Sequence, residues 1–422
     1  MKEFVELGEQ LEKRWRDHNY DENVFPELAA QALKEADLPS KLSAWDVTAW
    51  ALKESNLPEQ RDLHASFGEP PITLFNGARF HIDIYFWLSS TTAIHQHGFC
   101  GAFQVLLGGS LHCHYEFEQH ERINFHCALG KINLGDVEWL KPGDIKAIEA
   151  GKVYIHSLFH LENPSATIVV RTNSVPLAPP QFSYFKPFLA LDPFFVDATF
   201  VKKRQIIAAL LNARHESADD SINELLKTSD LHLTIELMQF LQANLGYARY
   251  SDAASSPQTA AQLARFDNFL QTAINRHEHL SDVLPAVFEH QTREFEIVRR
   301  RNFITDADHR YFLALLLNVE GRARILSLVA DRVPDRDPVE TILDWTDELG
   351  RTRLSGTNEN ALGIAEYNDV YAIVLEGMLR GKTIAEIGNE MNADFGDARR
   401  DELTQYHSTL ENSPLFAALW HN

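Results

Sequence analysis

Histidines are the residues in this 422-residue chain whose spacing is best suited to chemistry, and more than half of its 19 histidines lie between His64 and His160. His95 and His97 are two residues apart, so on a β-strand both imidazoles would point to the same side. A strand with this H-x-H spacing can offer a metal ion two adjacent nitrogen ligands. The pair therefore predicts a metal site, although the motif alone is a weak signal.

Two later segments also carry histidines on one side of a predicted strand. His112 and His114 repeat the H-x-H spacing on a predicted hairpin, where a solvated polar strand is a simpler interpretation than a second metal site. His156 and His160 are four residues apart on a strand that follows turns with glycine, and they too would share a side.

The segment FHIDIYFW at 80–87 alternates in polarity. Its apolar positions would form one face, and the opposite face would present His81, Asp83, Tyr85 and Trp87. This pattern predicts a barrel strand with its polar face toward a ligand cavity, against the alternative of a strand half exposed to solvent. Gln104 interrupts the apolar run at 102–107 and would point either into that cavity or to solvent.

These segments lie in a β-rich region with helical regions before and after it. Short runs rich in Val, Ile, Phe and Tyr alternate with turns containing Gly or Pro, which is typical of an antiparallel sandwich or barrel. The proline-rich stretch at 174–188 predicts a surface linker. We therefore expect an α+β protein with a helical lead-in (1–65), a β-barrel domain (66–180) and a helical domain (195–422).

Composition narrows the class of function. With 60 acidic and 39 basic residues the net charge is −21, which repels phosphate backbones, so we expect no nucleic-acid partner. No stretch approaches the roughly 20 apolar residues of a membrane helix, and the charged N-terminus does not resemble an export signal. Three cysteines cannot build a disulfide framework. We expect a cytoplasmic protein without a membrane partner.

In their order along the chain, the β-region motifs resemble the cupin superfamily. That family has an H-x-H on one strand, a glycine at the end of the next strand, and a later segment in which a glycine precedes one more histidine. The matching residues are His95, His97, Gly108, Gly109, Gly143, Gly151 and His156. The resemblance covers roughly residues 66–175 and implies a jelly-roll type of antiparallel β-barrel with a metal ion inside.

One departure from the usual family pattern is informative. Most cupins have a glutamate ligand after the second histidine, but the matching positions here are Gly101 and Ala102. A three-histidine cupin resembles the thiol dioxygenases, and cysteine dioxygenase in particular, which bind Fe(II) through three neutral histidines. The ligands that this resemblance implies are His95, His97 and His156.

The third ligand and the metal both have alternatives. His160 competes with His156 for the third position, and would otherwise be a hydrogen-bond donor beside the site. Fe(II) is the expected metal, with Mn, Zn and Ni as alternatives.

Cysteine dioxygenases also anchor the substrate carboxylate with an upstream arginine that has no match here. Arg171 could take that role or form a salt bridge at the rim, so the substrate need not be cysteine or a thiol.

We therefore expect a non-haem Fe(II)-dependent oxygenase that oxidises a small molecule with O₂, and a thiol is one candidate for that molecule. The residues expected to line its pocket are His81, Asp83, Tyr85, Trp87, Gln104 and Arg171. Two alternatives are a metal-containing sensor or binding protein, and a Mn- or Zn-dependent isomerase or hydrolase.

The helical domain carries no recognisable catalytic motif. Its Arg299–Arg301 run and the DADH at 306–309 fit charged helix ends. Long amphipathic helices could cap the barrel mouth or join two copies in a homodimer.

Overall fold

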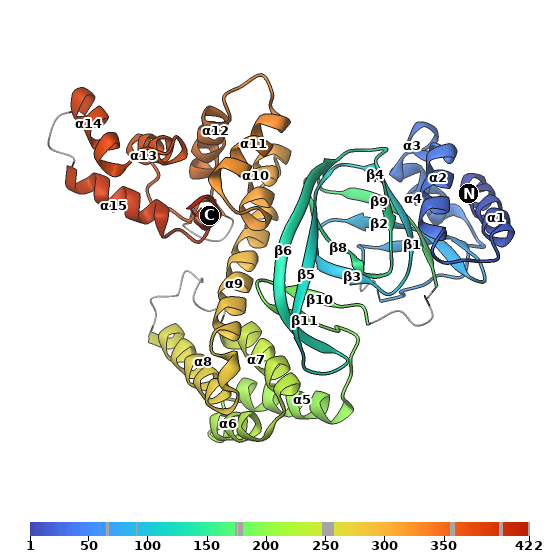
Figure 1. Ribbon diagram of the computed structural model, residues 1–422, viewed down its shortest axis with the longest axis horizontal. Coiled ribbons are helices and arrows are strands. Elements are labelled where there is room, and N and C mark those ends of the chain that lie inside the picture. The colour runs from blue at the N-terminus through green and yellow to red at the C-terminus, as the bar shows by residue number, and fades with distance from the viewer. Residues whose placement is uncertain are drawn as a thin grey trace.

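The computed structural model describes residues 1–64, 67–89, 91–173, 175, 180–246, 257–354, 359–395 and 400–420. The predicted boundary at 65–66 and residues 174 and 176–179 of the predicted linker lie outside the described residues. The α+β class is confirmed, because a β-barrel lies between two groups of helices (Figure 1). No helix in the described part of the chain is long and apolar enough to cross a membrane.

The N-terminal helices are α1 (Lys2–Asp17), α2 (Phe25–Ala36), α3 (Leu38–Lys41) and α4 (Ala44–Lys53). Helix α1 buries residues at helical spacing, among them Phe4, Leu7 and Leu11. These side chains share a hydrophobic cluster with the apolar face of the strand at 80–87, including Phe80 and Ile82. The predicted alternation is therefore real, but its apolar face is covered by helices.

The strands are β1 (Pro71–Asn76), β2 (Phe80–Trp87), β3 (Thr92–His97), β4 (Gly101–Leu107), β5 (Ser110–Arg122), β6 (Cys127–Leu140), β7 (Ile145–Ile148), β8 (Gly151–His160), β9 (Ser165–Thr172), β10 (Ser183–Phe185) and β11 (Leu189–Leu191). One sheet has the order β1-β2-β9-β4-β7, and the other closes in the order β10-β11-β6-β5-β8-β3. The second sheet places β3 beside β8, so the two strands with the predicted ligands are neighbours. Gly108 ends β4 with a φ of +72°, a conformation that favours glycine.

The predicted surface linker is partly wrong. Within it, Ser183–Phe185 forms β10, which pairs with both β3 and β11. Strand β11 pairs in turn with β6 and completes the closed sheet. The prediction was wrong because proline lacks the amide proton that a central strand donates, so a proline-rich stretch argues against strands. The short strand β10 contains no proline, however, and β11 begins after Pro187.

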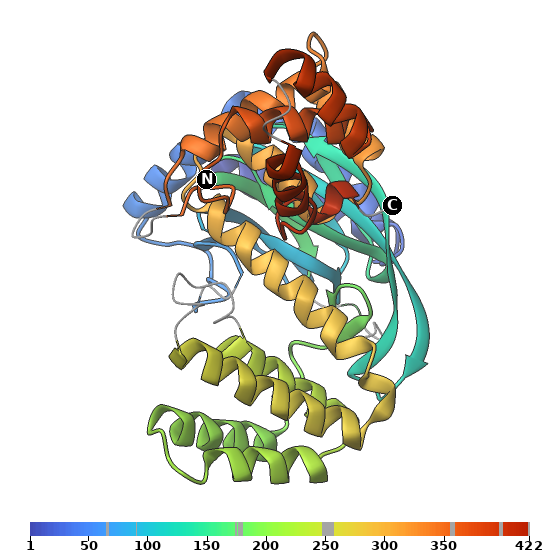
Figure 2. The same cartoon turned by 90° about the vertical axis from the view of Figure 1, so that its left-hand side faces the viewer.

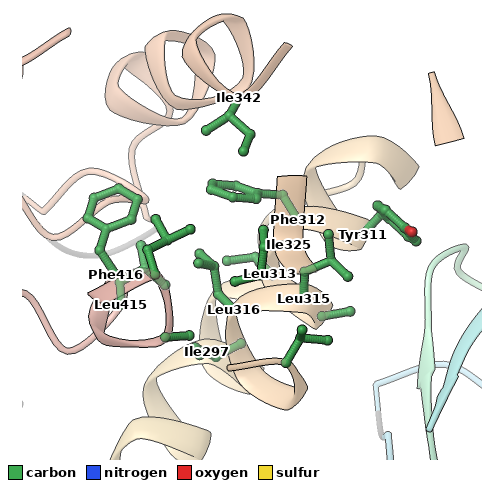
Figure 3. Close-up of a cluster of buried hydrophobic side chains, with 14 of the residues drawn as sticks. Ile297, Tyr311, Phe312, Leu313, Leu315, Leu316, Ile325, Ile342, Leu415 and Phe416 are labelled. Atoms are coloured by element: carbon green, nitrogen blue, oxygen red, sulfur yellow. The ribbon is translucent and has the colours of Figure 1, made fainter. Parts of the chain in front are cut away.

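The C-terminal helices are α5 (Ala198–Asn212), α6 (Ala218–Thr228), α7 (Leu231–Leu245), α8 (Pro257–Arg276), a 3₁₀ turn η2 (Glu278–Leu280), α9 (Val283–Arg301), α10 (Ala307–Asn318), α11 (Arg322–Arg332), α12 (Pro338–Arg351), α13 (Asp369–Leu379), α14 (Ile384–Phe395), α15 (Arg400–Glu411) and α16 (Ala417–Trp420). The long helix α9 connects α5–α8 with the later helices and crosses in front of the barrel in Figure 2. Residues of α9 and α10 such as Ile297 and Phe312 form a buried cluster with Phe416, which directly precedes α16 (Figure 3). The same cluster continues to Leu111 and Phe159 of the barrel, so these helices cover the outer face of the second sheet.

Two arginines join the helices to the end of β8. Arg301 and Arg310 are buried, with exposed fractions of 0% and 1%. Arg301 Nε donates to the His160 carbonyl at 2.8 Å, and Arg310 Nη1 donates to the Leu161 carbonyl at 2.8 Å. Burial, with a contribution from Arg310, lowers the pKa of Arg301 to about 10, so it stays charged at neutral pH.

The prediction of charged helix ends therefore holds for only one of the two clusters. Asp306 caps α10 by accepting from the backbone amides of Asp308 and His309, as expected for DADH. The run at 299–301 ends α9, but Arg301 is a buried link to the barrel rather than a solvated end.

We predict that Arg301→Ala lowers the free energy of unfolding by about 3 kcal/mol, because it empties a buried volume and leaves carbonyl groups unpaired. Urea unfolding would measure the change. The control is Arg351→Ala, whose exposed side chain pairs with Asp347 and should contribute less than about 0.5 kcal/mol. Equal effects of the two substitutions would contradict the structural role of Arg301.

Candidate metal centre

Three predicted ligands meet on the inner side of the second sheet. His95 and His97 extend from β3, and His156 lies directly opposite His95 on β8. One ring nitrogen from each lies within 4.8 Å of the others, and His97 Nε2 is 3.0 Å from His156 Nε2. All three side chains are buried. The two-residue spacing on β3 and the pairing with β8 together create this group.

The hydrogen bond of His95 fixes which of its nitrogens is free. His95 Nδ1 lies 2.8 Å from the carbonyl oxygen of Ala93. Because a carbonyl only accepts, the proton of the neutral ring lies on Nδ1, and Nε2 keeps its lone pair. Burial lowers the pKa of His95 to about 4, so the ring is neutral at physiological pH.

A chain of hydrogen bonds fixes the proton of His156 in the same way. His112 Nδ1 lies 2.9 Å from Glu138 Oε1, and His112 Nε2 lies 2.9 Å from His156 Nδ1. The hydrogen bond from His112 holds the pKa of Glu138 well below its usual range, and Lys146 contacts its other oxygen at 2.5 Å. An ionised carboxylate only accepts, so His112 donates from Nδ1 and accepts at Nε2. His156 then donates from Nδ1 and keeps a lone pair on Nε2.

These proton positions suit a bound cation. Burial lowers the pKa of both His97 and His156 well below the usual range, so neither ring carries a charge that would repel a metal ion. His97 Nε2 lies 3.0 Å from the lone pair of His156 Nε2, so in the metal-free protein His97 donates from Nε2. A bound cation would require this proton to move to His97 Nδ1, which has no hydrogen-bond partner among the described residues. Three neutral imidazoles with converging lone pairs fit Fe, Zn, Cu or Ni better than hard cations that prefer oxygen ligands.

A cavity of about 380 Å³ opens beside the three histidines. Of the predicted pocket residues, Tyr85, Trp87 and Arg171 line it. The remaining lining residues are mostly apolar or aromatic, namely Asp62, Phe67, Thr92, Phe99, Phe103, Ile148, Leu158, Thr167, Val169, Gln181 and Phe194. None of these belongs to the described helices α5–α16, so those helices do not line this cavity.

Arg171 is the positive group in the cavity wall. It extends from β9, where it pairs with Gly101 and His81 of the neighbouring strands. Its guanidinium carbon lies 3.6 Å from the centre of the Phe99 ring, which fixes the plane of the guanidinium. Its Nε has no hydrogen-bond partner among the residues that the structure describes. The cavity thus contains a donor suited to an anionic group.

Three predicted pocket residues do not line the cavity. His81 bonds to Asn173 Oδ1 at 2.8 Å, and Asp83 accepts from the Tyr85 hydroxyl at 3.1 Å, so both lie next to the lining residues. Gln104 is buried and donates to the Gly143 carbonyl at 3.4 Å, away from the histidines.

His160 lies outside the group of three histidines. Its ring stacks on Trp87 with centroids 4.6 Å apart and planes 15° from parallel. Its Nδ1 lies 2.9 Å from the hydroxyl of Ser110. His160 therefore supports the back of the cavity wall, and the geometry favours His156 as the third ligand.

Gly101 explains why no carboxylate joins the histidines. A Cβ atom at this position would lie 1.9 Å from the Val170 carbonyl oxygen on β9, so no side chain fits. The close pairing of β4 with β9 thus leaves the metal group without an acidic ligand at this place.

The preferred interpretation of His112 and His114 as a solvated strand is wrong for His112, which is fully buried. Sequence reasoning also missed Glu138, which lies opposite His112 on β6. A single glutamate in a polar strand gives no signal of its own. The repeated H-x-H of β5 was the one available indication that this strand contributes to the site.

Comparisons with known proteins give no assignment. No family model matches the chain, and no curated protein matches it. Among solved structures, a protein of Thermus thermophilus is 20% identical with a TM-score of 0.18, over 27% of this chain and 97% of that one. A DMSP lyase of Ruegeria pomeroyi is 14% identical with a TM-score of 0.20, over 32% of this chain and 62% of that one. The polyketide cyclase of Streptomyces resistomycificus is 15% identical with a TM-score of 0.19, over 31% of this chain and 77% of that one. Similarities this low carry no inference about this chain.

We predict that His112→Phe weakens metal binding by about 10- to 100-fold, because the proton of His156 loses its acceptor. Anaerobic titration with Fe(II) or Co(II) would measure the dissociation constant. His120→Phe, on an exposed part of the same strand, is the control and should leave it unchanged. Equal affinity of His112→Phe and the wild type would contradict the hydrogen-bond chain.

We also predict that the metal-free protein loses stability as the pH falls from about 6.5 to 4. An unfolded histidine takes up a proton near pH 6.5, whereas His95 and His112 in the fold resist protonation down to about pH 4. The unfolded state therefore binds more protons in this window, and the free energy of unfolding falls by about 1.4 kcal/mol per pH unit for each such ring. Urea unfolding at pH 7, 6 and 5 would test this, with a shallower slope expected for His95→Gln than for His120→Gln.

Proposed function

We propose that this chain is a metal-dependent enzyme with a cupin-type barrel, and that it uses Fe(II) and O₂ to oxidise a small organic anion. The observation that carries the proposal is the convergence of three neutral imidazoles on a cavity that Arg171 also lines. When bound to His95, His97 and His156, Fe(II) would supply open coordination positions for O₂ and for an anionic group of the substrate.

The positive groups of the cavity support an anionic substrate, although the Asp62 carboxylate also belongs to the lining. Neutral imidazoles leave the metal's charge uncompensated, and the tight contact at Gly101 excludes a carboxylate that would reduce it. Arg171 adds a second positive charge to the same cavity. A carboxylate can accept a charge-assisted hydrogen bond from the guanidinium while a second anionic group, such as a thiolate, faces the histidines.

The apolar lining determines the rest of the recognition. Phe99 and Phe103 lie beside the histidines and exclude water, which strengthens the attraction between Arg171 and an anion. Burial raises the pKa of Tyr85, so its hydroxyl stays protonated and donates to Asp83. Tyr85 is therefore a neutral part of the wall and not a general base. Thiol carboxylates small enough for about 380 Å³ are the first substrates to screen.

Turnover would be measured as O₂ uptake by Fe(II)-loaded protein with a panel of small thiol and non-thiol acids. We expect uptake to require both Fe(II) and one substrate, and to disappear in His95→Ala. Full turnover in His95→Ala would refute the proposal. The same three-histidine set also suits Zn(II) in hydrolytic sites, so turnover with Zn(II) and without O₂ would replace the oxygenase by a hydrolase or isomerase.

We predict that Arg171→Met raises the KM for a carboxylate substrate by about 10- to 100-fold, because a charge-assisted hydrogen bond contributes about 1.5–3 kcal/mol. Metal content should stay the same, since Arg171 is not among the ligands. Arg122→Met is the matched control, because Arg122 also lies over a phenylalanine ring but at the exposed end of β5. An unchanged KM in Arg171→Met would remove Arg171 from substrate binding.

A further inference from the structure

A second group of possible metal ligands lies on the other side of His156. His112 and His114 lie two residues apart on β5, and Glu138 is the cross-strand partner of His112 on β6. One ligand atom from each lies within 4.8 Å of the others, and His114 Nε2 is 3.8 Å from Glu138 Oε1. The His114 and Glu138 side chains are 31% and 35% exposed, so a cation can reach the group from solvent.

We propose that His112, His114 and Glu138 form a second divalent-cation site, suited to Zn(II), and that a cation bound there excludes a cation from the centre at His95, His97 and His156. Two imidazoles and one carboxylate are a ligand set that zinc accepts, with water completing the coordination. The exclusion rests on the proposed function for the first centre, whereas the second site itself does not.

The position of one proton in each ring makes the two sites compete. When His156 Nε2 binds a cation, its remaining proton lies on Nδ1 and points at His112 Nε2, 2.9 Å away. His112 then carries its own proton on Nδ1, the atom that the second site needs. The first site therefore removes the lone pair of a ligand in the second.

The reverse arrangement is equally restrictive. When His112 Nδ1 binds a cation, the ring proton lies on Nε2 and donates to His156 Nδ1. His156 then carries its proton on Nε2 and cannot act as a ligand. Both rings stay neutral in either arrangement, and only the protonated nitrogen differs. Tyr154 Oη lies 3.3 Å from His112 Nε2, and its hydroxyl can donate or accept, so it permits both.

One nearby charge opposes the second site and provides a test of it. Lys146 Nζ contacts Glu138 Oε2 at 2.5 Å and would repel a cation on the neighbouring oxygen. Its side chain is 29% exposed, so the ammonium can move toward solvent when a cation binds. Removing this charge should tighten binding at the second site.

The experiment is equilibrium dialysis of the full chain against Zn(II), with bound metal measured by plasma mass spectrometry. We expect the wild type to bind one zinc per chain, and a second only at about 100-fold higher free zinc. His95→Ala and His114→Ala should each still bind one, and the double variant none. His120→Ala should match the wild type.

Further variants separate ligation from structural damage. In the His95→Ala background, His114→Cys should keep the zinc because a thiolate also ligates it, whereas His114→Ala should lose it. Lys146→Met in the same background should tighten zinc binding several-fold.

Three results would overturn parts of this scheme in different ways. Absence of zinc from His95→Ala would remove the second site, and two zinc ions bound with equal affinity to the wild type would remove the exclusion. If His114→Ala abolished all binding while His95→Ala had no effect, the second site would stand and the proposed first centre would fail.

Discussion

The hydrogen bond between His112 Nε2 and His156 Nδ1 is the interaction on which the candidate site depends. Through this bond Glu138, an ionised carboxylate on β6, determines which nitrogen of His112 on β5 is protonated, and thereby which nitrogen of His156 on β8 is protonated. In an apolar barrel a neutral imidazole can offer either nitrogen, and this chain determines which one faces the cavity. The lone pair with which His156 would bind a metal is thus fixed by a residue that does not touch that metal.

This arrangement requires both faces of the barrel to be covered. The N-terminal helices bury the outer face of the first sheet, and α9 and α10 bury that of the second. Arg301 and Arg310 donate to the carbonyls of His160 and Leu161 at the end of β8, four and five residues beyond His156. We infer that the helical half, which lines no part of the described cavity, contributes rigidity to the strand that carries the third ligand.

The fold class, the strands around the H-x-H motif and the shared side of His95 and His97 were predictable, because each depends on local periodicity or on spacing within one strand. The alternation in β2 likewise predicted that Tyr85 and Trp87 share a face, and both line the cavity. The strand at 183–185 was not predictable, since three residues after a proline-rich stretch give no periodic signal. The direction of the Gln104 side chain, into the cavity or toward solvent, could not be predicted because its sequence neighbours are apolar on both sides.

By itself, the sequence determined which imidazoles could point together, because residues two apart on a strand share a side. Only the tertiary structure decided that His156 rather than His160 completes the group, since that depends on the register of β3 against β8. The same holds for Glu138 and Arg171, whose roles arise from cross-strand pairs far apart in the sequence. Register is set by the packing of whole sheets, and no short motif encodes it.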